Sequence, residues 1–469
     1  MFTLFNPELA RAGQELKECF ASFTAGQWTD AELARYQTGK LRETIAYVQQ
    51  NSDFYRRHLA IVDAAGLTLD SLASVPFTTK DDLRREMASL LSKPISQAWI
   101  FYETTGTTGV STPCPRDNLD SLSNNMALTF YYDTIFRDGG DSQVIGVAAP
   151  TELHSFGDTF GDVCRNLGLA VAKMWPHSPM VGFDRALHVL AALPVTGLFC
   201  TPGMALSLAK RAIAAGLNPQ EAFKLKVIMC LGELASPSLL ANIGSLWGAR
   251  AYNGLYASQE ASVLGAAGAD GGLYAAPLLN IYEVIDPDTG LAVPAGHDGM
   301  RTGELVVTSL YQGSKPLVRY RTGDLVRISP RQPGRSLPAD RLAVLGRTRD
   351  TQVIGGYEIS GLDLENLLLR YPRGYLDYQI VIDCTDGTDE LTLRLEVPPG
   401  DPVLIDPILI DAACRAELGV RVRVEYGPLG AITTTGAMVS WKAARIVDLR
   451  QVTQDAESLA ALSIASGRS

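Results

Sequence analysis

The sequence Tyr-Glu-Thr-Thr-Gly-Thr-Thr-Gly spans residues 102–109, directly after an apolar run that is typical of the end of a buried strand. Its two glycines, Gly106 and Gly109, allow tight turns that expose consecutive backbone N–H groups. With the hydroxyls of four threonines, these N–H groups could hold an oxyanion such as a triphosphate. The threonines are Thr104, Thr105, Thr107 and Thr108. Taken alone, the stretch fits a phosphate-binding loop and a plain turn between two strands equally well.

The composition is that of a folded protein with more than one domain. The chain has 469 residues, of which 46% are hydrophobic and 20% charged, and this length exceeds one ordinary hydrophobic core. The formal net charge is -10, and an acidic surface repels phosphate backbones and anionic lipids. Nucleic acids and membranes are therefore not expected partners. A phosphate site would have to be formed locally, by backbone N–H groups and a few cations.

The cysteines and histidines do not predict a metal site. The 7 cysteines are scattered without a C-x-x-C pair, and the 5 histidines form no H-E-x-x-H pattern. This distribution is typical of reduced thiols in a cytosolic compartment. The sequence shows neither a leader-like start nor a long apolar span, so we expect a cytoplasmic protein.

The hydrophobic pattern predicts a large N-terminal α/β domain. Between residues 99 and 260, short apolar runs alternate with helical patterns, which favours a largely parallel sheet. Residues 280–330 have the short strands and turns of an antiparallel, barrel-like subdomain. The predicted strands of the first part cover 144–148, 197–201 and 227–231, and its helices lie near 158–168, 183–193, 203–216 and 236–247.

A smaller α+β domain is predicted at the C-terminus. The pattern changes after a polar, proline-bearing stretch at 329–340, and we place the boundary between a domain at 1–348 and a domain at 349–469. The predicted helices of the second domain cover 361–370 and 403–417, and its strands cover 378–383, 391–397 and 420–425.

Four charged residues downstream of the Thr/Gly stretch could carry chemistry. Glu260 ends the run Leu-Tyr-Ala-Ser-Gln-Glu, just past a predicted strand. Asp324 ends Tyr-Arg-Thr-Gly-Asp, where a carboxylate after a Thr-Gly turn could bridge vicinal ribose hydroxyls. Arg347 stands at the domain boundary, and Lys442 lies near the C-terminus in Trp-Lys-Ala-Ala-Arg. Singly, each also fits a structural role, as a capping acid, a turn residue, a surface ion pair or a solvated lysine.

In this order, the motifs resemble those of the adenylate-forming superfamily, which includes acyl- and aryl-CoA synthetases, luciferases and the adenylation domains of peptide synthetases. The resemblance covers nearly the whole chain. It is greatest to the phenylacetate–CoA ligase branch, whose N-terminal features are similar to residues 42–55 and 76–83. It implies ATP-dependent activation of a carboxylic acid to an acyl-adenylate with release of pyrophosphate, followed by transfer to a thiol such as CoA.

The resemblance also implies a nucleotide site in the large domain. Besides the Thr/Gly loop, the implied ATP- or AMP-binding residues are Gly232, Glu233, Tyr256, Gln259, Asp324 and Arg347. Gly232 and Glu233 stand where the family has a Gly-Glu turn beside the adenine, and Asp324 would hold the ribose. Glu260 would bind Mg²⁺.

A mobile C-terminal domain would complete the catalytic site. The resemblance implies that Lys442 reaches the acyl oxygen and the α-phosphate, so that Lys442, Glu260 and Arg347 are the predicted catalytic residues. Asp350 is the implied hinge about which the domain turns between the two half-reactions. After this turn, a tunnel for the thiol arm would be lined by Gly355, Gly356 and Tyr357.

The pocket for the acid is implied to lie between the strand after Pro150 and the region of Tyr256. Its predicted lining residues are His154, Phe156, Gly157, Cys230, Gly254 and Leu255, together with Tyr256. Aromatic rings in this set favour a flat aromatic acid. Asp158 or Asp162 could face a substrate amine, and both also fit exposed positions of a helix.

Some positions depart from the family pattern. The Thr/Gly loop continues as Val-Ser-Thr-Pro where the family usually has a lysine, so a phosphate-binding cation is missing, and Arg116 is one candidate to replace it. Ala257 and Gln259 stand in place of the Gly and Thr of the metal motif, and Trp441 stands where a Gly usually precedes the lysine.

Three functions remain open from the sequence. The first is an aryl- or acyl-CoA ligase that uses ATP, Mg²⁺ and CoA. The second is a stand-alone adenylating enzyme that delivers the acyl group to a separate carrier protein's phosphopantetheine or to an amine. The third, from another class, is an inactive homologue that acts as a binding subunit. A homodimer is also compatible with the sequence.

Overall fold

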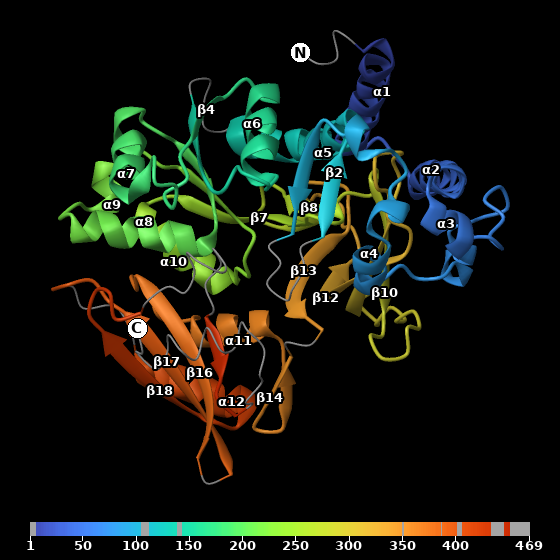
Figure 1. The fold of residues 1–469 in the computed structure, drawn as a ribbon. Coiled ribbons are helices and arrows are strands. Elements are labelled where there is room, and N and C mark those ends of the chain that lie inside the picture. Colours follow the sequence, from blue (N-terminus) through green and yellow to red (C-terminus); the bar gives the residue numbers. More distant parts are fainter. Residues whose placement is uncertain are drawn as a thin grey trace.

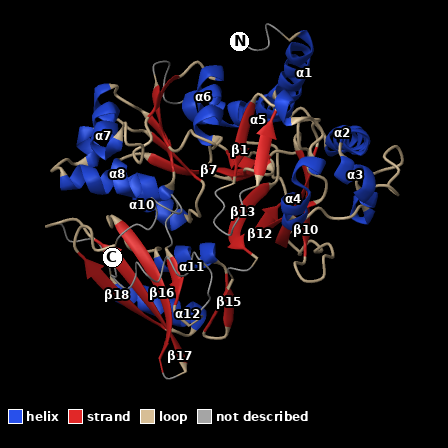
Figure 2. Ribbon diagram, in the orientation of Figure 1, coloured by secondary structure: helices blue, strands red, loops and turns tan. Residues whose placement is uncertain are grey.

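The computed structural model describes residues 6–104, 112–137, 143–348, 351–385, 387–400, 406–432 and 445–450. These residues form a large α/β part and a smaller C-terminal part that lies against one side of it (Figure 1). In Figure 2 the strands of the large part run through its centre, with helices outside them. Within the described ranges, none of the helices is long and apolar enough to cross a membrane.

The large part contains the following elements. Its helices are α1 (Pro7–Thr24), α2 (Asp30–Asn51), α3 (Asp53–His58), α4 (Lys80–Glu86), α5 (Asn118–Arg137), α6 (Phe156–Asn166), α7 (Gly182–Ala192), α8 (Pro202–Ala214), α9 (Pro219–Ala222) and α10 (Pro237–Trp247). Its strands are β1 (Ile100–Glu103), β2 (Pro113–Arg116), β3 (Val144–Ala148), β4 (Ala170–Lys173), β5 (Gly197–Cys200), β6 (Val227–Leu231), β7 (Arg250–Ser258), β8 (Ser262–Ala267), β9 (Leu273–Ala275), β10 (Asn280–Ile285), β11 (Arg301–Ser309), β12 (Tyr320–Ser329) and β13 (Arg341–Arg347).

An 11-stranded sheet organises this part, in the order β10-β11-β12-β13-β9-β8-β7-β6-β5-β3-β4. Strands β4, β3, β5, β6 and β7 are parallel, and the remaining pairs are antiparallel. The strand β6 is buried along its whole length, as expected for a parallel strand covered on both faces. Ile228 and Cys230 pack in the core that includes α8 and α10, whereas Met229 and Leu231 pack in the core that includes α5 and α6.

The predicted alternation of strands and helices matches the structure to within a few residues. The predicted strands at 144–148 and 227–231 are β3 and β6, and the four predicted helices correspond to α6, α7, α8 and α10. The strands predicted between 280 and 330 are antiparallel, and they continue the same sheet through β9 and β13. The Thr322-Gly323 pair, predicted as a turn, lies inside β12 instead. Gly323 has φ +71°, which lets the strand bend locally without ending.

The elements of the small part lie C-terminal to β13 in the sequence. Its elements are β14 (Gln352–Ile354), β15 (Tyr357–Ile359), α11 (Gly361–Leu368), β16 (Asp377–Thr385), β17 (Thr388–Glu396), α12 (Pro407–Leu418), β18 (Arg421–Gly427) and β19 (Ile446–Asp448). Strands β18, β17, β16 and β19 form a 4-stranded sheet, and β14 pairs with β15. The short strand β19 was not predicted, because three residues carry too little periodicity to separate them from a loop.

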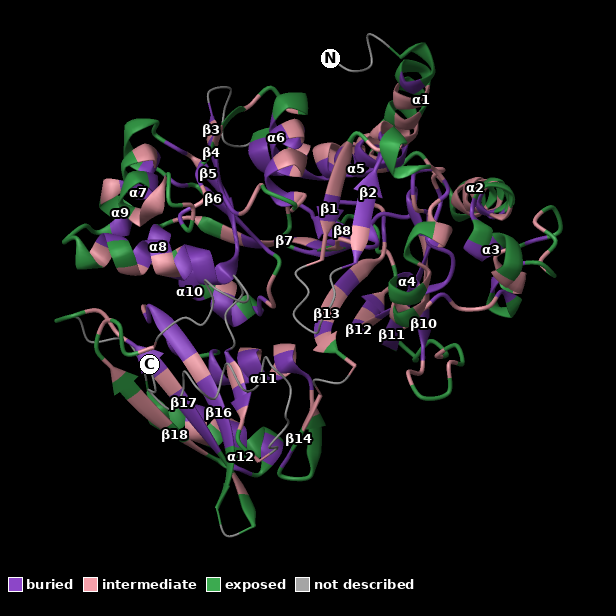
Figure 3. Cartoon of the chain, viewed as in Figure 1, coloured by how far each residue is buried: buried purple, intermediate pink, exposed green. Residues whose placement is uncertain are grey.

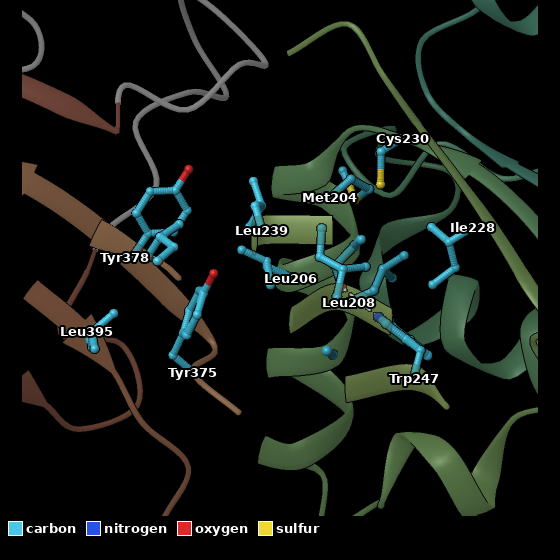
Figure 4. Close-up of a cluster of buried hydrophobic side chains, with 14 of the residues drawn as sticks. Met204, Leu206, Leu208, Ile228, Cys230, Leu239, Trp247, Tyr375, Tyr378 and Leu395 are labelled. Carbon is cyan, nitrogen blue, oxygen red and sulfur yellow. Dashed lines mark hydrogen bonds between the residues drawn. The ribbon is translucent and has the colours of Figure 1, made fainter. Parts of the chain in front are cut away.

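The two parts share one hydrophobic core. Leu206 on α8 and Leu239 on α10 are fully buried in the same cluster as Tyr375, Tyr378 and Leu395 of the small part (Figure 4). Figure 3 shows the corresponding buried positions on α10, β16 and β17. The small part is therefore docked through apolar side chains on the face of α8 and α10.

Polar contacts surround this core. Lys210 Nζ on α8 lies 3.1 Å from Asp377 Oδ2 and 3.0 Å from Glu396 Oε2. The Ser236 N–H at the start of α10 donates to Glu365 Oε1 at 2.8 Å. Asn242 donates to the Tyr375 carbonyl at 2.9 Å. These bonds fix one orientation of the small part against the large one.

Candidate active site

Strands β1 and β2 close the base of the Thr/Gly loop. Glu103 lies opposite Pro113 in this antiparallel pair. The Thr104 N–H then donates to Thr112 O at 3.2 Å, and the Thr112 N–H donates to Thr104 Oγ1 at 2.9 Å. The hydroxyl of Thr104 is thus engaged at the base of the loop. The other predicted loop residues, Thr105, Gly106, Thr107, Thr108 and Gly109, lie outside the described residues.

Asp324 meets two other predicted site residues. The Tyr256 hydroxyl donates to Asp324 Oδ2 at 2.7 Å, and Arg347 Nε lies 3.1 Å from Asp324 Oδ1. The last contact follows from the register, because Asp324 on β12 pairs with Arg347 on β13. Burial raises the pKa of Asp324, although the charge of Arg347 and the hydrogen bond from Tyr256 act in the opposite direction. The structure therefore brings the predicted ribose acid, its tyrosine and the predicted arginine into one cluster.

Glu260 lies close to this cluster and is held by a lysine. Only 6% of its side chain is exposed, and Lys80 Nζ lies 3.2 Å from its Oε1 atom. Burial opposes ionisation of Glu260, but the charges of Lys80 and Lys315 and a backbone hydrogen bond outweigh it, so its pKa is lowered. The carboxylate is kept in the charged form that binds cations. The neighbouring Gln259 is half-buried, and its Oε1 atom accepts no hydrogen bond within the part of the chain described.

The surroundings of Glu260 fit a nucleotide-bound magnesium ion. Among the described residues, no three His, Cys, Asp or Glu side chains form a cluster that could hold a metal by themselves. Mg²⁺ that accompanies a nucleotide usually takes one or two carboxylates and completes its shell with phosphate oxygens and water. A single ionised Glu260 beside the base of a phosphate loop meets this requirement.

Two lysines near Glu260 were missed by the sequence reasoning. Lys80 belongs to the stretch 76–83, which was recognised as similar to an N-terminal feature of the family branch but was given no role in the site. Lys315 Nζ lies 3.2 Å from Pro113 O and 3.5 Å from Cys114 Sγ, directly after the Thr/Gly loop. No spacing in the sequence could have linked either lysine to Glu260, because their elements come together only in the folded chain.

Gly232 and Glu233 follow β6 at the carboxyl end of the parallel strands. Gly232 has φ +80°, and Glu233 Oε2 accepts a hydrogen bond from the Gly203 N–H at 3.1 Å. A Cβ atom on Gly203 would lie 3.2 Å from both Glu233 Oε2 and Arg445 Nη2. The small part therefore reaches this end of the sheet through Arg445, three positions after Lys442 in the sequence.

Several predicted pocket residues lie on the side of the sheet that carries α6. Phe156 packs against Phe160 with ring centroids 5.0 Å apart, and Leu255 borders the same core. The Phe156 N–H donates to His154 Nδ1 at 3.3 Å. A Cβ atom on Gly157 would lie 2.3 Å from the side chain of Thr151, so this position admits only glycine without a local shift.

Of the other two predicted pocket residues, Gly254 lies against Met229 and Leu231 in the core on the α6 side, whereas Cys230 is placed differently. The Cys230 side chain is fully buried among Met204 and Leu239, in the core shared with the small part (Figure 4). The Gly254 carbonyl accepts a hydrogen bond from the Tyr132 hydroxyl at 2.7 Å. Cys230 thus faces away from the side on which Phe156 lies.

Both acids considered for a substrate amine have partners within the protein. Asp158 Oδ1 lies 3.2 Å from Lys173 Nζ, and its Oδ2 accepts a hydrogen bond from the Tyr102 hydroxyl at 3.2 Å. Asp162 Oδ1 lies 2.8 Å from Arg165 Nη1. Their negative charge is therefore largely balanced by cations of the chain itself.

The predicted thiol-tunnel residues form the turn of the β14–β15 hairpin. Gly355 and Gly356 have φ +59° and +83°, the left-handed values that a tight two-residue hairpin turn requires. The Gly355 N–H donates to Asp389 Oδ2 at 2.8 Å, and Tyr357 is 57% exposed. The predicted hinge Asp350 and the predicted catalytic Lys442 lie outside the described residues.

Comparison with known proteins finds relatives along most of the chain, although no family model matches it. The phenylacetate–coenzyme A ligase of Thermus thermophilus is 27% identical over 455 residues, which cover 90% of this chain and 97% of that protein. The phenylacetate–coenzyme A ligase of Escherichia coli is 24% identical over 440 residues, which cover 90% and 96% of the two chains. The predicted resemblance to this branch is confirmed.

Solved structures show the same fold. A 2-hydroxyisobutyryl-CoA ligase in its postadenylation state, in complex with 2-HIB-AMP, superimposes with a TM-score of 0.73 at 23% identity and covers 94% of each chain. The same ligase in its thioesterification state, with CoA also bound, gives a TM-score of 0.61 at 24% identity and covers 94% of each chain. The predicted fold class is confirmed.

Proposed function

We propose that this chain, a relative of the phenylacetate–CoA ligases within the adenylate-forming superfamily, is an ATP-dependent, AMP-forming acid–thiol ligase. It activates a carboxylic acid to an acyl-adenylate with release of pyrophosphate and then transfers the acyl group to CoA. The observation that carries the proposal is the contact of Tyr256 and Arg347 with Asp324, within electrostatic range of the buried Glu260. The named activity of the relatives supports both steps.

The first step must bring two anions together, a carboxylate and a triphosphate, so neutralising charge is its main requirement. Mg²⁺, when bound, neutralises phosphate charge, and Glu260 is the residue that would hold it. Asp324 would accept hydrogen bonds from the ribose hydroxyls, and Arg347 and Tyr256 fix its carboxylate for this purpose. Lys442 would supply a further positive charge at the α-phosphate from the small part.

The acid is proposed to be aromatic and to lack a free amine. Phe156 and Leu255 supply apolar surface on the side of the sheet that carries α6. Asp158 and Asp162, which could have bound an ammonium group, are engaged by Lys173 and Arg165 instead. The relatives are named phenylacetate–coenzyme A ligases, which also supports an arylacetic acid as the substrate.

CoA is the proposed acceptor in the second step. The relatives are named as coenzyme A ligases, and one structural neighbour was solved with CoA. For the thiol to approach, the small part would turn about Asp350, which withdraws Lys442 and brings the β14–β15 hairpin to the acyl-adenylate. The chain thus acts as a CoA ligase and not as a donor to a carrier protein or an amine.

The proposal is tested by acid-dependent exchange between ATP and labelled pyrophosphate, with phenylacetate, benzoate, short aliphatic acids and aminobenzoates as candidate acids. We expect exchange to be fastest with an arylacetic or aryl acid that has no amine. Thioester formation is then measured with CoA and with a phosphopantetheine-bearing carrier protein. Exchange without any acid preference, or transfer to the carrier but not to CoA, would contradict the proposal.

A further inference from the structure

The ion pair between Lys80 and Glu260 joins the N-terminal segment to the acid that would bind magnesium. Lys80 Nζ lies 3.2 Å from Glu260 Oε1, with 38% of the lysine side chain and 6% of the glutamate side chain exposed. Burial raises the pKa of Asp324, and the positive charge of Lys80 lowers it. Lys80 therefore lies within electrostatic range of this acid, which is predicted to bind the ribose. The ammonium group therefore stands at the border between the nucleotide cluster and solvent.

The position of Lys80 is fixed by contacts of the residues that precede it and by the helix that it begins. The Thr78 N–H donates to Arg319 O at 3.0 Å, and the Arg321 N–H donates to Thr78 O at 2.9 Å, so the segment pairs with the start of β12. The ring of Phe77 faces the Arg319 guanidinium, and its centroid lies 4.1 Å from the guanidinium carbon, Cζ. Thr79 caps α4, whose first residue is Lys80. Because β12 also carries Asp324, the same strand positions Lys80 and the ribose acid.

Other cations near Glu260 already have protein partners. Lys315 contacts Pro113 O and Cys114 Sγ, and Arg347 pairs with Asp324. The Arg116 guanidinium lies 5.2 Å from the centre of the Tyr102 ring and is buried. Lys80 differs from these, because its partner is the carboxylate that would be taken up by the metal.

We propose that Lys80 supplies the phosphate-binding cation that the Thr/Gly loop lacks, and that Glu260 holds it in place until the nucleotide arrives. This inference rests on the proposed function. When Glu260 becomes a metal ligand, it no longer neutralises Lys80, and the ammonium group is free to bind a phosphate oxygen of ATP. The Glu260 carboxylate thus pairs with Lys80 in the empty enzyme and with the metal in the nucleotide-bound enzyme.

The test compares ATP binding and magnesium dependence in the full-length chain without any acid substrate. ATP binding is followed by calorimetry at saturating Mg²⁺, and the half-saturating Mg²⁺ concentration is measured at fixed ATP. Lys80→Met should raise the Kd for ATP roughly ten- to hundredfold, as expected for a lost charge-assisted hydrogen bond. It should also lower the half-saturating Mg²⁺ concentration, because Glu260 is no longer paired.

Two variants serve as controls. Lys80→Arg keeps the charge and should stay within a few-fold of the unmodified chain in both measurements. Lys224→Met removes an exposed lysine in the connection before β6 and should change neither. A lysine that merely supports the fold would instead shift ATP and Mg²⁺ affinity in the same direction. Such a parallel loss, or an unchanged Kd for ATP in Lys80→Met, would overturn the inference.

A further variant changes the other member of the pair, Glu260. Glu260→Gln frees Lys80 without the metal, so ATP should bind more tightly than to the unmodified chain when EDTA replaces Mg²⁺. Adding Lys80→Met to this variant should remove most of that gain, and retention of the full gain would contradict a role for Lys80.

The outcome separates this inference from the function on which it rests. Absence of ATP binding and of acid-dependent pyrophosphate exchange in the unmodified chain would contradict the proposed function itself. If the unmodified chain binds ATP and Lys80→Met binds it equally well, only the role of Lys80 fails.

Discussion

The ammonium group of Lys210 on α8 lies 3.1 Å from Asp377 Oδ2, across the border between the large and the small part. Glu396 contacts the same ammonium group, and Arg445 pairs with the other oxygen of Asp377. Asp377 and Glu396 are buried, with 2% and 0% of their side chains exposed. A turn of the small part would have to break this cluster, so the cluster favours the arrangement seen here.

Lys210→Met should weaken the docked arrangement and slow adenylation. Leaving one partner of a buried ion pair unpaired costs about 3–5 kcal/mol, and Arg445 still compensates Asp377, so we expect the lower end of that range. The rate of pyrophosphate exchange should fall at least about tenfold, whereas thioester formation from supplied acyl-adenylate should change less. The matched control is Arg211→Met on the same helix, because Arg211 pairs only with the exposed Asp184 of the large part among the described residues. Equal effects of the two substitutions would contradict a role of Lys210 in docking.

Glu365→Gln should change how stability depends on pH. Burial raises the pKa of Glu365 in the folded chain, against the opposing hydrogen bonds from Tyr378 and the Ser236 N–H. The folded state therefore holds this proton more tightly than the unfolded state, and the stabilisation is complete below the unfolded pKa and lost as pH rises through the folded one. Glutamine keeps a donor and an acceptor in place and does not titrate.

This expectation is checked by thermal unfolding of both proteins between about pH 4 and pH 8, a range that begins near the ordinary glutamate pKa. The variant should gain in melting temperature relative to the unmodified chain as pH rises. A constant difference across the series would show that Glu365 does not titrate in this range.

Tyr256→Phe should weaken ATP binding by removing one fixed donor to Asp324. The lost hydrogen bond joins a buried phenol to a carboxylate at 2.7 Å, and bonds to charged groups contribute about 1.5–3 kcal/mol. Because the bond also lowers the pKa of Asp324, ATP binding by the variant should decline at a higher pH than in the unmodified chain when the solution is acidified. Calorimetry across a pH series measures both effects. Tyr426→Phe, at an exposed position of β18, is the control and should leave them unchanged.

Lys442→Ala should separate the two half-reactions. The resemblance to the adenylate-forming enzymes implies that this lysine acts on the α-phosphate, so losing it should cost about 3–4 kcal/mol of the adenylation barrier, or a few hundredfold in rate. Pyrophosphate exchange reports the loss. Thioester formation from chemically prepared acyl-adenylate should be nearly unaffected, and an equal fall in both reactions would contradict a mechanism with two arrangements of the small part.

The sequence allowed much of the fold to be predicted because its signals are local. The apolar runs at 227–231 and 144–148 and the helices between them carry their own periodicity, and the structure has them at nearly the same bounds. Thr322 and Gly323 were predicted as a turn, since Thr-Gly is a common turn signal. The motif at 320–324 lies in a strand because Tyr320 and Arg321 pair with β11 and Asp324 pairs with β13. The register with β11 shifts between Arg321 and Leu325, a stretch that includes Gly323.

The candidate site was predicted only where motifs name its members. Glu260, Asp324 and Arg347 each stand in a recognisable stretch, and the structure places them together. Lys80 also lies in a recognised stretch, 76–83, but it was not linked to the site, because its position depends on the pairing of Thr78 with β12, a contact between segments far apart in the chain. Cys230 illustrates the opposite case, because it was predicted to line the pocket and yet faces the other side of its strand.

The hydrophobic core shared by α8, α10 and the small part has a thermal consequence. Leaving the docked arrangement would expose Tyr375, Tyr378 and the leucines that face them, and exposure of apolar surface raises the heat capacity. Hydrophobic stabilisation weakens on cooling, so the docked arrangement should lose part of its advantage at low temperature. Temperature would then shift the balance between adenylation and thiol transfer, even though the chemistry at Glu260 and Asp324 stays the same.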